Sequence, residues 1–253
     1  MDGSMRQGFT LVELSIVLVI LGLLVGGVLA GQSLIHAAEL RSVTTEFRNL
    51  QTAYGAFREK YFALPGDMKN AVSFWGAQAG GTAEGVDATC QALDASTPST
   101  DSKTCNGDGS GIIDDSNPMS YEAPRSWQHL ANAGLIEGSY TGVDTDNITP
   151  GLNAPGSRFK PGVWGVTGEY SGGVNLFTAK YGSTFYFSNA GNAVFKPEDL
   201  YGIDQKIDDG TPNKGRIVTW RDAAVPDCIT ATEDAYKLDY QGVSCIGIFI
   251  SGY

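Results

Sequence analysis

The chain has 253 residues, of which 42% are hydrophobic and 18% are charged. This length can bury a core and fits one domain, or one domain with an appended element. The formal net charge of −11 argues against a nucleic-acid-binding protein, because phosphate contacts depend on Lys and Arg.

An apolar segment lies near the start of the chain. It runs from Phe9 to Ala30, which is long enough to cross about 30 Å of hydrocarbon, and Glu13 is its only charged residue. A secretory signal has a shorter apolar stretch of about 7–15 residues followed by a cleavage site. We therefore predict that residues 9–35 form a transmembrane or assembly helix.

The next segment, residues 36–64, has one apolar face. Its large apolar residues recur at intervals of three or four positions: Val43, Phe47, Leu50, Tyr54, Phe57 and Tyr61. This spacing is typical of an amphipathic helix. We predict one continuous helix from about Phe9 to Phe62, which ends before Pro65 and packs its second half against its own globular domain.

Glu13 is costly in an apolar environment, and two interpretations of it are open. A carboxylate in a membrane span is disfavoured by up to about 3.5 kcal/mol at the centre and by less near the interface. Glu13 can stay at the membrane surface without any role. Alternatively, it meets a cation when several chains associate.

The sequence RQGFTLVELSIVLVI, residues 6–20, resembles the processing motif of type IV pilins and type II secretion pseudopilins. The resemblance implies a leader peptide of residues 1–8, with either Met1 or Met5 as the true start. It implies that a prepilin peptidase cleaves between Gly8 and Phe9, and that the new amino terminus of Phe9 is N-methylated.

The resemblance also supplies a partner for Glu13. In a filament, Glu13 of one chain would neutralise the Phe9 amine of a neighbour, and the two charges would be tolerated together where each alone is costly. The implied partners are copies of the chain or other pilins, the peptidase, an inner-membrane assembly platform and membrane lipid, with no nucleic acid. The implied location is the bacterial inner membrane, with the globular domain periplasmic, and then a pilus or pseudopilus.

Many members of this family have a proline where this chain has Ala30, and here four glycines lie around that position instead. Gly22 with Gly26, and Gly27 with Gly31, form two GxxxG spacings. Such spacings allow close helix packing, and glycine also weakens a helix. Both interpretations stay open.

The remaining residues, 65–253, predict an extracytoplasmic α+β domain with a long variable loop at 76–123. We expect a helix within residues 126–140 and an antiparallel meander of strands at 162–170, 174–181 and 183–189. A short helix, a turn and a strand follow between residues 196 and 220, and a last strand lies at 245–251. Together with the N-terminal helix, the fold class is α+β and pilin-like.

The four cysteines form two local pairs, Cys90 with Cys105 and Cys228 with Cys245. No CxxC or histidine-containing metal spacing accompanies them. Two short-range disulfides in an oxidising compartment are therefore preferred, and four reduced thiols are the alternative.

Two acidic segments resemble cation-binding loops. Asn106, Asp108, Ser110 and Asp114 alternate with glycines as in calcium loops, although the full EF-hand pattern is missing. A plain turn explains the same residues. Asp204, Asp208 and Asp209 form a second group, for which a solvated helix end is the alternative to a Ca²⁺ site. No other cofactor is expected.

The sequence leaves three candidate functions. The first is a structural filament subunit, and the second is a minor, tip-located pilin whose 76–123 loop acts as an adhesin or ligand-binding module. The third is a membrane-tethered enzyme. The enzyme is disfavoured, because the sequence contains no GxSxG, HExxH or phosphate-loop motif and because His129, which is expected on an exposed face or at the edge of the core, has no nucleophile pattern beside it.

Overall fold

A computed structural model describes residues 10–78, 102–113, 122–143, 148–168, 184–219 and 227–252. By its internal contacts the chain divides into two units, residues 1–41 and residues 42–253. One helix, α1 (Leu11–Tyr61), contributes to both units. The predicted continuous N-terminal helix is therefore confirmed.

The second half of α1 packs with the face that its spacing predicted. Val43, Phe47, Leu50, Tyr54 and Phe57 are all buried. The helix ends where Phe62 takes a left-handed conformation with φ of 55°, ahead of the Pro-Gly turn at residues 65–66. Phe62 itself is 93% exposed, so this ending is not held by packing of its side chain.

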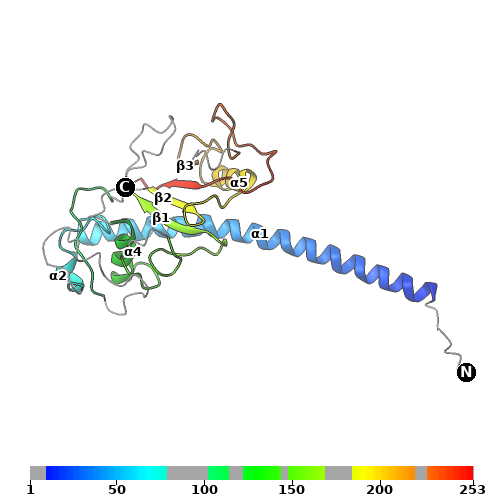
Figure 1. Cartoon of the computed structure of the whole chain (residues 1–253), viewed down its shortest axis with the longest axis horizontal. Helices are drawn as coiled ribbons and strands as arrows, with labels where there is room; N and C mark the ends of the chain where they lie inside the picture. Colours follow the sequence, from blue (N-terminus) through cyan, green and yellow to red (C-terminus); the bar gives the residue numbers. More distant parts are fainter. Residues whose placement is uncertain are drawn as a thin grey trace, which may run out of the picture. The chain divides into compact units, whose positions relative to one another are not determined.

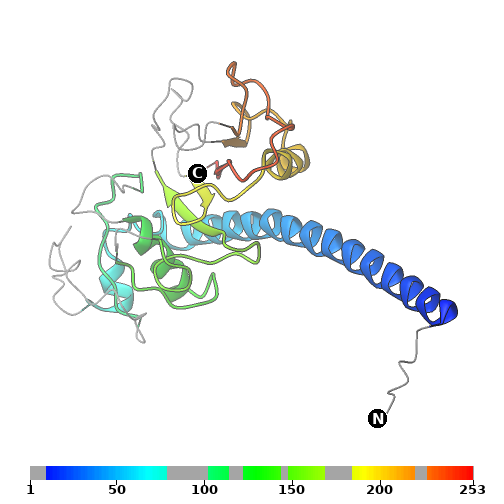
Figure 2. The ribbon, with the colours of Figure 1, turned by 45° about the vertical axis from the view of Figure 1, so that its right-hand side comes forward.

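An antiparallel sheet of four strands faces the second half of α1 (Figures 1 and 2). The strands are β1 (Val163–Thr167), β2 (Thr184–Ser188), β3 (Ile217–Thr219) and β4 (Gly247–Ile250), in the order β1-β2-β4-β3. The registers pair Val166 with Phe185 and Phe185 with Phe249. Because directly paired residues share one face, these apolar side chains gather on one side of the sheet.

Aromatic rings fill the space between the helix and the sheet. Phe47 contacts the rings of Trp164 and Phe249, with centroids 6.5 and 5.0 Å apart. Tyr54 meets Phe185 edge to face at 4.8 Å. These contacts join the amphipathic half of α1 to three strands, and the α+β, pilin-like fold class is confirmed.

The predicted meander is wrong in its order. Residues 162–170 were expected to pair with residues 174–181, but β1 pairs directly with β2, and the other neighbour of β2 is β4. Residues 174–181 lie outside the described residues. The turn signals on either side of that segment indicated reversals of the chain but carried no information about which strands become neighbours.

Three short helices complete the described part of the chain. They are α2 (Ala71–Trp75), α4 (Glu122–Asn132) and α5 (Pro197–Ile207). The sequence predicted α4 and α5, although α4 begins four residues earlier than the predicted Ser126, and it did not predict α2. Much of the predicted variable loop, residues 79–101 and 114–121, lies outside the described residues.

Candidate assembly segment and candidate cation sites

The first part of α1 exposes a continuous apolar surface. In its most apolar 18-residue window the mean hydropathy is 2.7, and none of that window is buried. Leu11 is 86% exposed and Leu23 is 72% exposed. By length and composition this helix can cross a membrane. A surface of this kind needs lipid or other apolar helices to cover it.

Glu13 takes part in a capping box at the first turn of α1. The backbone N–H and the hydroxyl of Thr10 both donate to Glu13 Oε2, each at 2.8 Å. In return, the Glu13 N–H donates to Thr10 Oγ1 at 3.2 Å. This reciprocal arrangement satisfies donors that a helix N-terminus leaves free. This capping box was not predicted, although Thr-x-x-Glu before an apolar run is its signature.

The predicted partner of Glu13 lies outside the described residues, as do both residues of the predicted cleavage site, Gly8 and Phe9. Within the described part of α1, the next Asp, Glu, Lys or Arg after Glu13 is Glu39. Glu13 is exposed in the isolated chain. Its carboxylate is thus the one acidic group that the apolar part of the helix presents.

The four glycines of the apolar part do not break the helix, because α1 is continuous through all of them. A Cβ atom placed on Gly22, Gly26, Gly27 or Gly31 would meet nothing within 4 Å. No contact with the described residues therefore requires glycine at these positions. The close packing that GxxxG allows would have to come from another helix.

Cys228 and Cys245 form a disulfide, with Cα atoms 5.0 Å apart. This distance is normal for a disulfide. The bond ties the turn that begins at Asp227 to the entrance of β4. The other predicted pair includes Cys90, which lies outside the described residues, while Cys105 is not a free thiol.

The first predicted calcium loop is only partly described, because Asp114 lies outside the described residues. Asn106 is buried, and its Oδ1 accepts a hydrogen bond from the Val72 N–H at 2.9 Å. Asp108 Oδ1 accepts from the Ser110 N–H at 2.8 Å. The Asn106 side chain is thus used to hold α2, and Asp108 with Ser110 forms a local turn.

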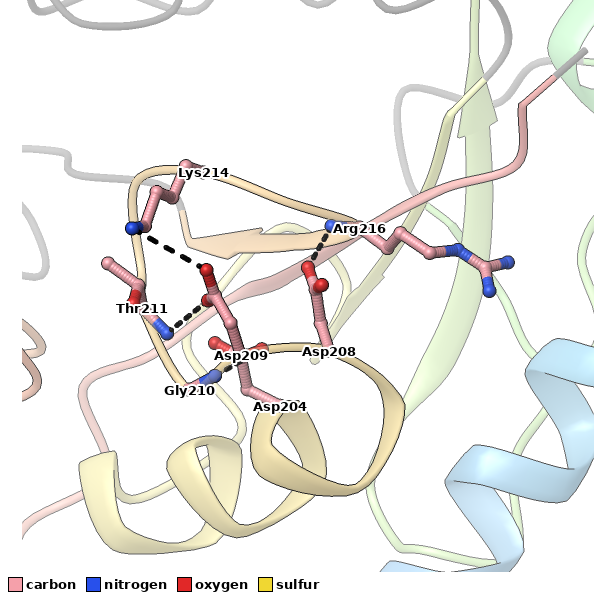
Figure 3. Close-up of polar contacts among 7 residues, drawn as sticks. All are labelled: Asp204, Asp208, Asp209, Gly210, Thr211, Lys214 and Arg216. Carbon is pink, nitrogen blue, oxygen red and sulfur yellow. Dashed lines mark hydrogen bonds and ion pairs between the residues drawn. The ribbon is translucent and has the colours of Figure 1, made fainter.

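The second predicted group is held by its own neighbours (Figure 3). Asp204 Oδ1 accepts from the Gly210 N–H and its Oδ2 accepts from the Tyr236 hydroxyl. Asp208 accepts from the Arg216 N–H. The remaining acid, Asp209, accepts from the Thr211 N–H and pairs with Lys214 at 3.6 Å. These donors explain the arrangement of the three acids without a cation.

Asp108 also belongs to a group that the sequence did not reveal. One carboxylate oxygen from each of Asp67, Asp108 and Glu122, here called the carboxylate cluster, lies within 4.8 Å of the others. Asp67 and Glu122 are buried and Asp108 is exposed. Burial and the neighbouring Asp108 carboxyl raise the pKa of Asp67 to about 6. The only sequence signal for Asp67 was the Pro-Gly-Asp turn.

Two glycines let the segments that carry the carboxylate cluster approach each other. A Cβ on Gly107 would overlap the backbone of Gly66 and Asp67. A Cβ on Gly66, whose φ is 91°, would overlap the backbone carbonyl of Glu122. The turn after α1, the segment 102–113 and the start of α4 therefore meet backbone to backbone.

His129 is fully buried, which corrects the expectation that it lies on an exposed face or at the edge of the core. Its Nδ1 accepts from the Gly66 N–H at 3.0 Å, so the ring proton is on Nε2, which lies 3.1 Å from the Cys105 carbonyl oxygen. Burial, and secondarily the charge of Arg125, lowers the pKa of His129 to about 3. The imidazole is a neutral structural link.

Comparison with known proteins gives one match. Residues 3–29 match the family model of the prokaryotic N-terminal methylation motif. The matched residues include the predicted processing position and the capping box of Glu13. No curated protein and no solved structure matches the chain significantly.

Proposed function

We propose that the chain is a structural subunit of a type IV pilus-like or type II secretion pseudopilus filament. It carries the prokaryotic N-terminal methylation motif, which confirms the resemblance of its first residues to type IV pilins and pseudopilins. The motif points to a structural subunit and not to an enzyme. In this proposal the inner membrane stores the subunit, prepilin peptidase cleaves it between Gly8 and Phe9, and Phe9 is N-methylated.

The apolar surface of α1 is the observation that supports the proposal most strongly. A helix that buries nothing in its own chain over the most apolar window must be covered by lipid before assembly and by neighbouring helices afterwards. We propose that residues 9–35 are the part so covered, that residues 36–64 join it to the globular domain, and that residues 65–253 remain outside the membrane.

Glu13 is the residue that would pair with the amino terminus of a neighbouring subunit in the filament. Both Thr10 donors go to Oε2, and among the described residues Oε1 has no donor. A methylated Phe9 amine from another chain can therefore reach Oε1 without breaking the capping box. An ion pair in a bundle of apolar helices is tolerated only when both partners are present, and loss of one partner costs about 3–5 kcal/mol.

Three substitutions separate the charge of Glu13 from its capping role. Glu13→Ala removes both, Glu13→Gln keeps an acceptor for the capping box and removes the charge, and Thr10→Ala keeps the charge and removes the box. We expect all three chains to be cleaved and membrane-inserted. Filament yield, measured by electron microscopy and by immunoblotting of sheared filaments, should fall strongly for both Glu13 variants and little for Thr10→Ala.

The pattern of results distinguishes the two roles of the acid. If Glu13→Gln assembled normally while Thr10→Ala did not, the carboxylate would serve helix capping, and the proposed ion pair would be wrong. Normal filaments from Glu13→Ala would contradict both roles.

A further inference from the structure

The carboxylate cluster gathers three acids from three separate segments. Asp67 follows α1, Asp108 lies in the segment 102–113, and Glu122 begins α4. We propose that these three carboxylates bind one Ca²⁺ ion. The proposed ligand set shares only Asp108 with the calcium loop predicted from the sequence, and it does not depend on the proposed function of the chain.

One oxygen of Asp67 is the first reason for this proposal. The residue is only 3% exposed. Its Oδ2 accepts from the Gly111 N–H at 2.9 Å, but its buried Oδ1 has no hydrogen-bond partner among the described residues. Leaving a buried acceptor without a donor is costly. The carboxylate faces two further acids, so a cation is the group that would satisfy this oxygen.

Backbone amides also hold all three carboxylates in place, as amides hold the acids of the second predicted group, and the unpartnered Asp67 Oδ1 is what distinguishes this cluster. Asp67 is held by Gly111, Asp108 Oδ1 accepts from the Ser110 N–H at 2.8 Å, and Glu122 Oε1 accepts from the Asp108 N–H at 3.0 Å. Each acid is therefore oriented by one N–H group before any ion arrives. Such outer-shell donors are the usual means of fixing the ligands of a metal ion.

The chemistry and spacing of the ligands favour calcium. Calcium binds oxygen ligands at about 2.3–2.6 Å, so two ligands of one ion can lie up to about 5 Å apart. Separations within 4.8 Å fit this range, and calcium accepts irregular sets of carboxylate oxygens, whereas magnesium demands near-octahedral geometry and usually keeps several waters. The cluster offers no nitrogen or sulfur ligand, which the softer metals prefer.

Nearby cations neutralise the carboxylate cluster only in part, and the cluster borders a cavity and solvent. Lys69 lies near Asp108 and Arg125 lies near Glu122, and the two cations offset only part of the charge of three carboxylates. A cavity of about 890 Å³ is lined by Asp67, Lys69 and Gly111, among other residues. The cavity thus borders the carboxylate cluster at Asp67, and Asp108 is exposed to solvent.

Isothermal titration of the full chain with calcium chloride tests the proposal, using protein in detergent that has been freed of cations with EDTA. We expect one Ca²⁺ per chain and a rise in Tm on binding. Asp67→Asn should weaken calcium binding by at least about tenfold. Loss of a residue that only supports a ligand already weakens metal binding by about that factor, and Asp67 is a proposed direct ligand. Glu122→Gln, which keeps an acceptor for the Asp108 N–H, should do the same.

Two control variants address the other acidic groups. Asp208→Asn changes the second predicted group and Asp114→Asn changes the loop predicted from the sequence, and both should bind calcium as the unmodified chain does. Loss of binding in either control with retention in Asp67→Asn would overturn the assignment. Absence of binding by the unmodified chain at millimolar calcium would overturn it as well, whether or not the variants fold. An equal Tm rise with magnesium chloride would contradict the choice of calcium.

Discussion

Glu13 and His129 are both polar side chains, but the first is exposed and the second is buried. Glu13 is exposed on a helix that lacks other acids in its apolar part, and its capping box leaves one carboxylate oxygen for a further donor. His129 is enclosed, and the Gly66 amide and the Cys105 carbonyl occupy its two ring nitrogens. The first is suited to assembly, and the second holds the domain together.

His129 should make the domain less stable in acid. Its pKa is lowered from the usual 6.5 to about 3 in the folded chain. Between these values the unfolded chain binds a proton that the folded chain does not, so this contribution to stability is complete above pH 6.5 and is lost as the pH falls toward 3. Asp67 and Asp204, whose pKa values are each raised by burial to about 6, act in the opposite direction.

Comparison with His129→Gln isolates the histidine. Near neutral pH the variant should be less stable by roughly 1–3 kcal/mol, because the hydrogen bonds of the imidazole are lost or distorted. The difference should shrink below pH 6.5, by up to about 1.4 kcal/mol per pH unit, because glutamine does not titrate. Urea unfolding of the full chain in detergent, at several pH values, measures this difference in the free energy of unfolding, and His36→Gln is the control. A difference that stays constant with pH would contradict a neutral, buried His129.

At the scale of elements, α1 changes its role along its length. From Val43 onward its apolar face is buried, and Phe47 contacts the rings of Trp164, Phe185 and Phe249. The earlier apolar residues are exposed on all sides of the helix. A single helix thus belongs to the core of the domain in one half and offers an uncovered surface in the other.

Phe47→Ala tests this division. Removing a buried aromatic ring from a core costs about 3–5 kcal/mol, so the variant should lower the free energy of unfolding by that amount. Val25→Ala, in the exposed part of the same helix, should change it by less than about 0.5 kcal/mol, as substitutions at exposed positions usually do. Urea unfolding followed by near-ultraviolet circular dichroism compares the two. Equal losses would show that the early part of α1 is packed within its own chain.

The elements differ in how far the sequence predicts them. The limits and buried face of α1 follow from local spacing, and β1, β2 and β4 each lie within a predicted strand. The strand order does not follow, because the placement of β4 between β2 and β3 depends on packing between distant residues. The short helix α2 has only five residues, too few to show a helical period, and its Asn70, although a common N-cap residue, makes no side-chain cap.

At the scale of the whole molecule, the sequence predicts a site only where its residues are neighbours in the chain. The methylation motif is contiguous and could be recognised directly. The carboxylate cluster takes its acids from positions 67, 108 and 122, and only the folded chain brings them together. The acids that were adjacent in sequence, Asp208 and Asp209, instead find donors in their own turn.

The proposed role of the molecule depends on a new amino terminus at Phe9. Without cleavage, the Phe9 nitrogen stays in the uncharged Gly8–Phe9 peptide bond, and Glu13 would have no counter-ion of the proposed kind. The exposed surface of α1 would then serve only as a membrane anchor.

Intact-mass and N-terminal peptide mass spectrometry of the chain recovered from membranes tests this claim most directly. We expect a chain that begins at Phe9 and carries one additional methyl group on its terminal amine. A chain that still begins at Met1 or Met5, in cells with an active prepilin peptidase, would contradict it.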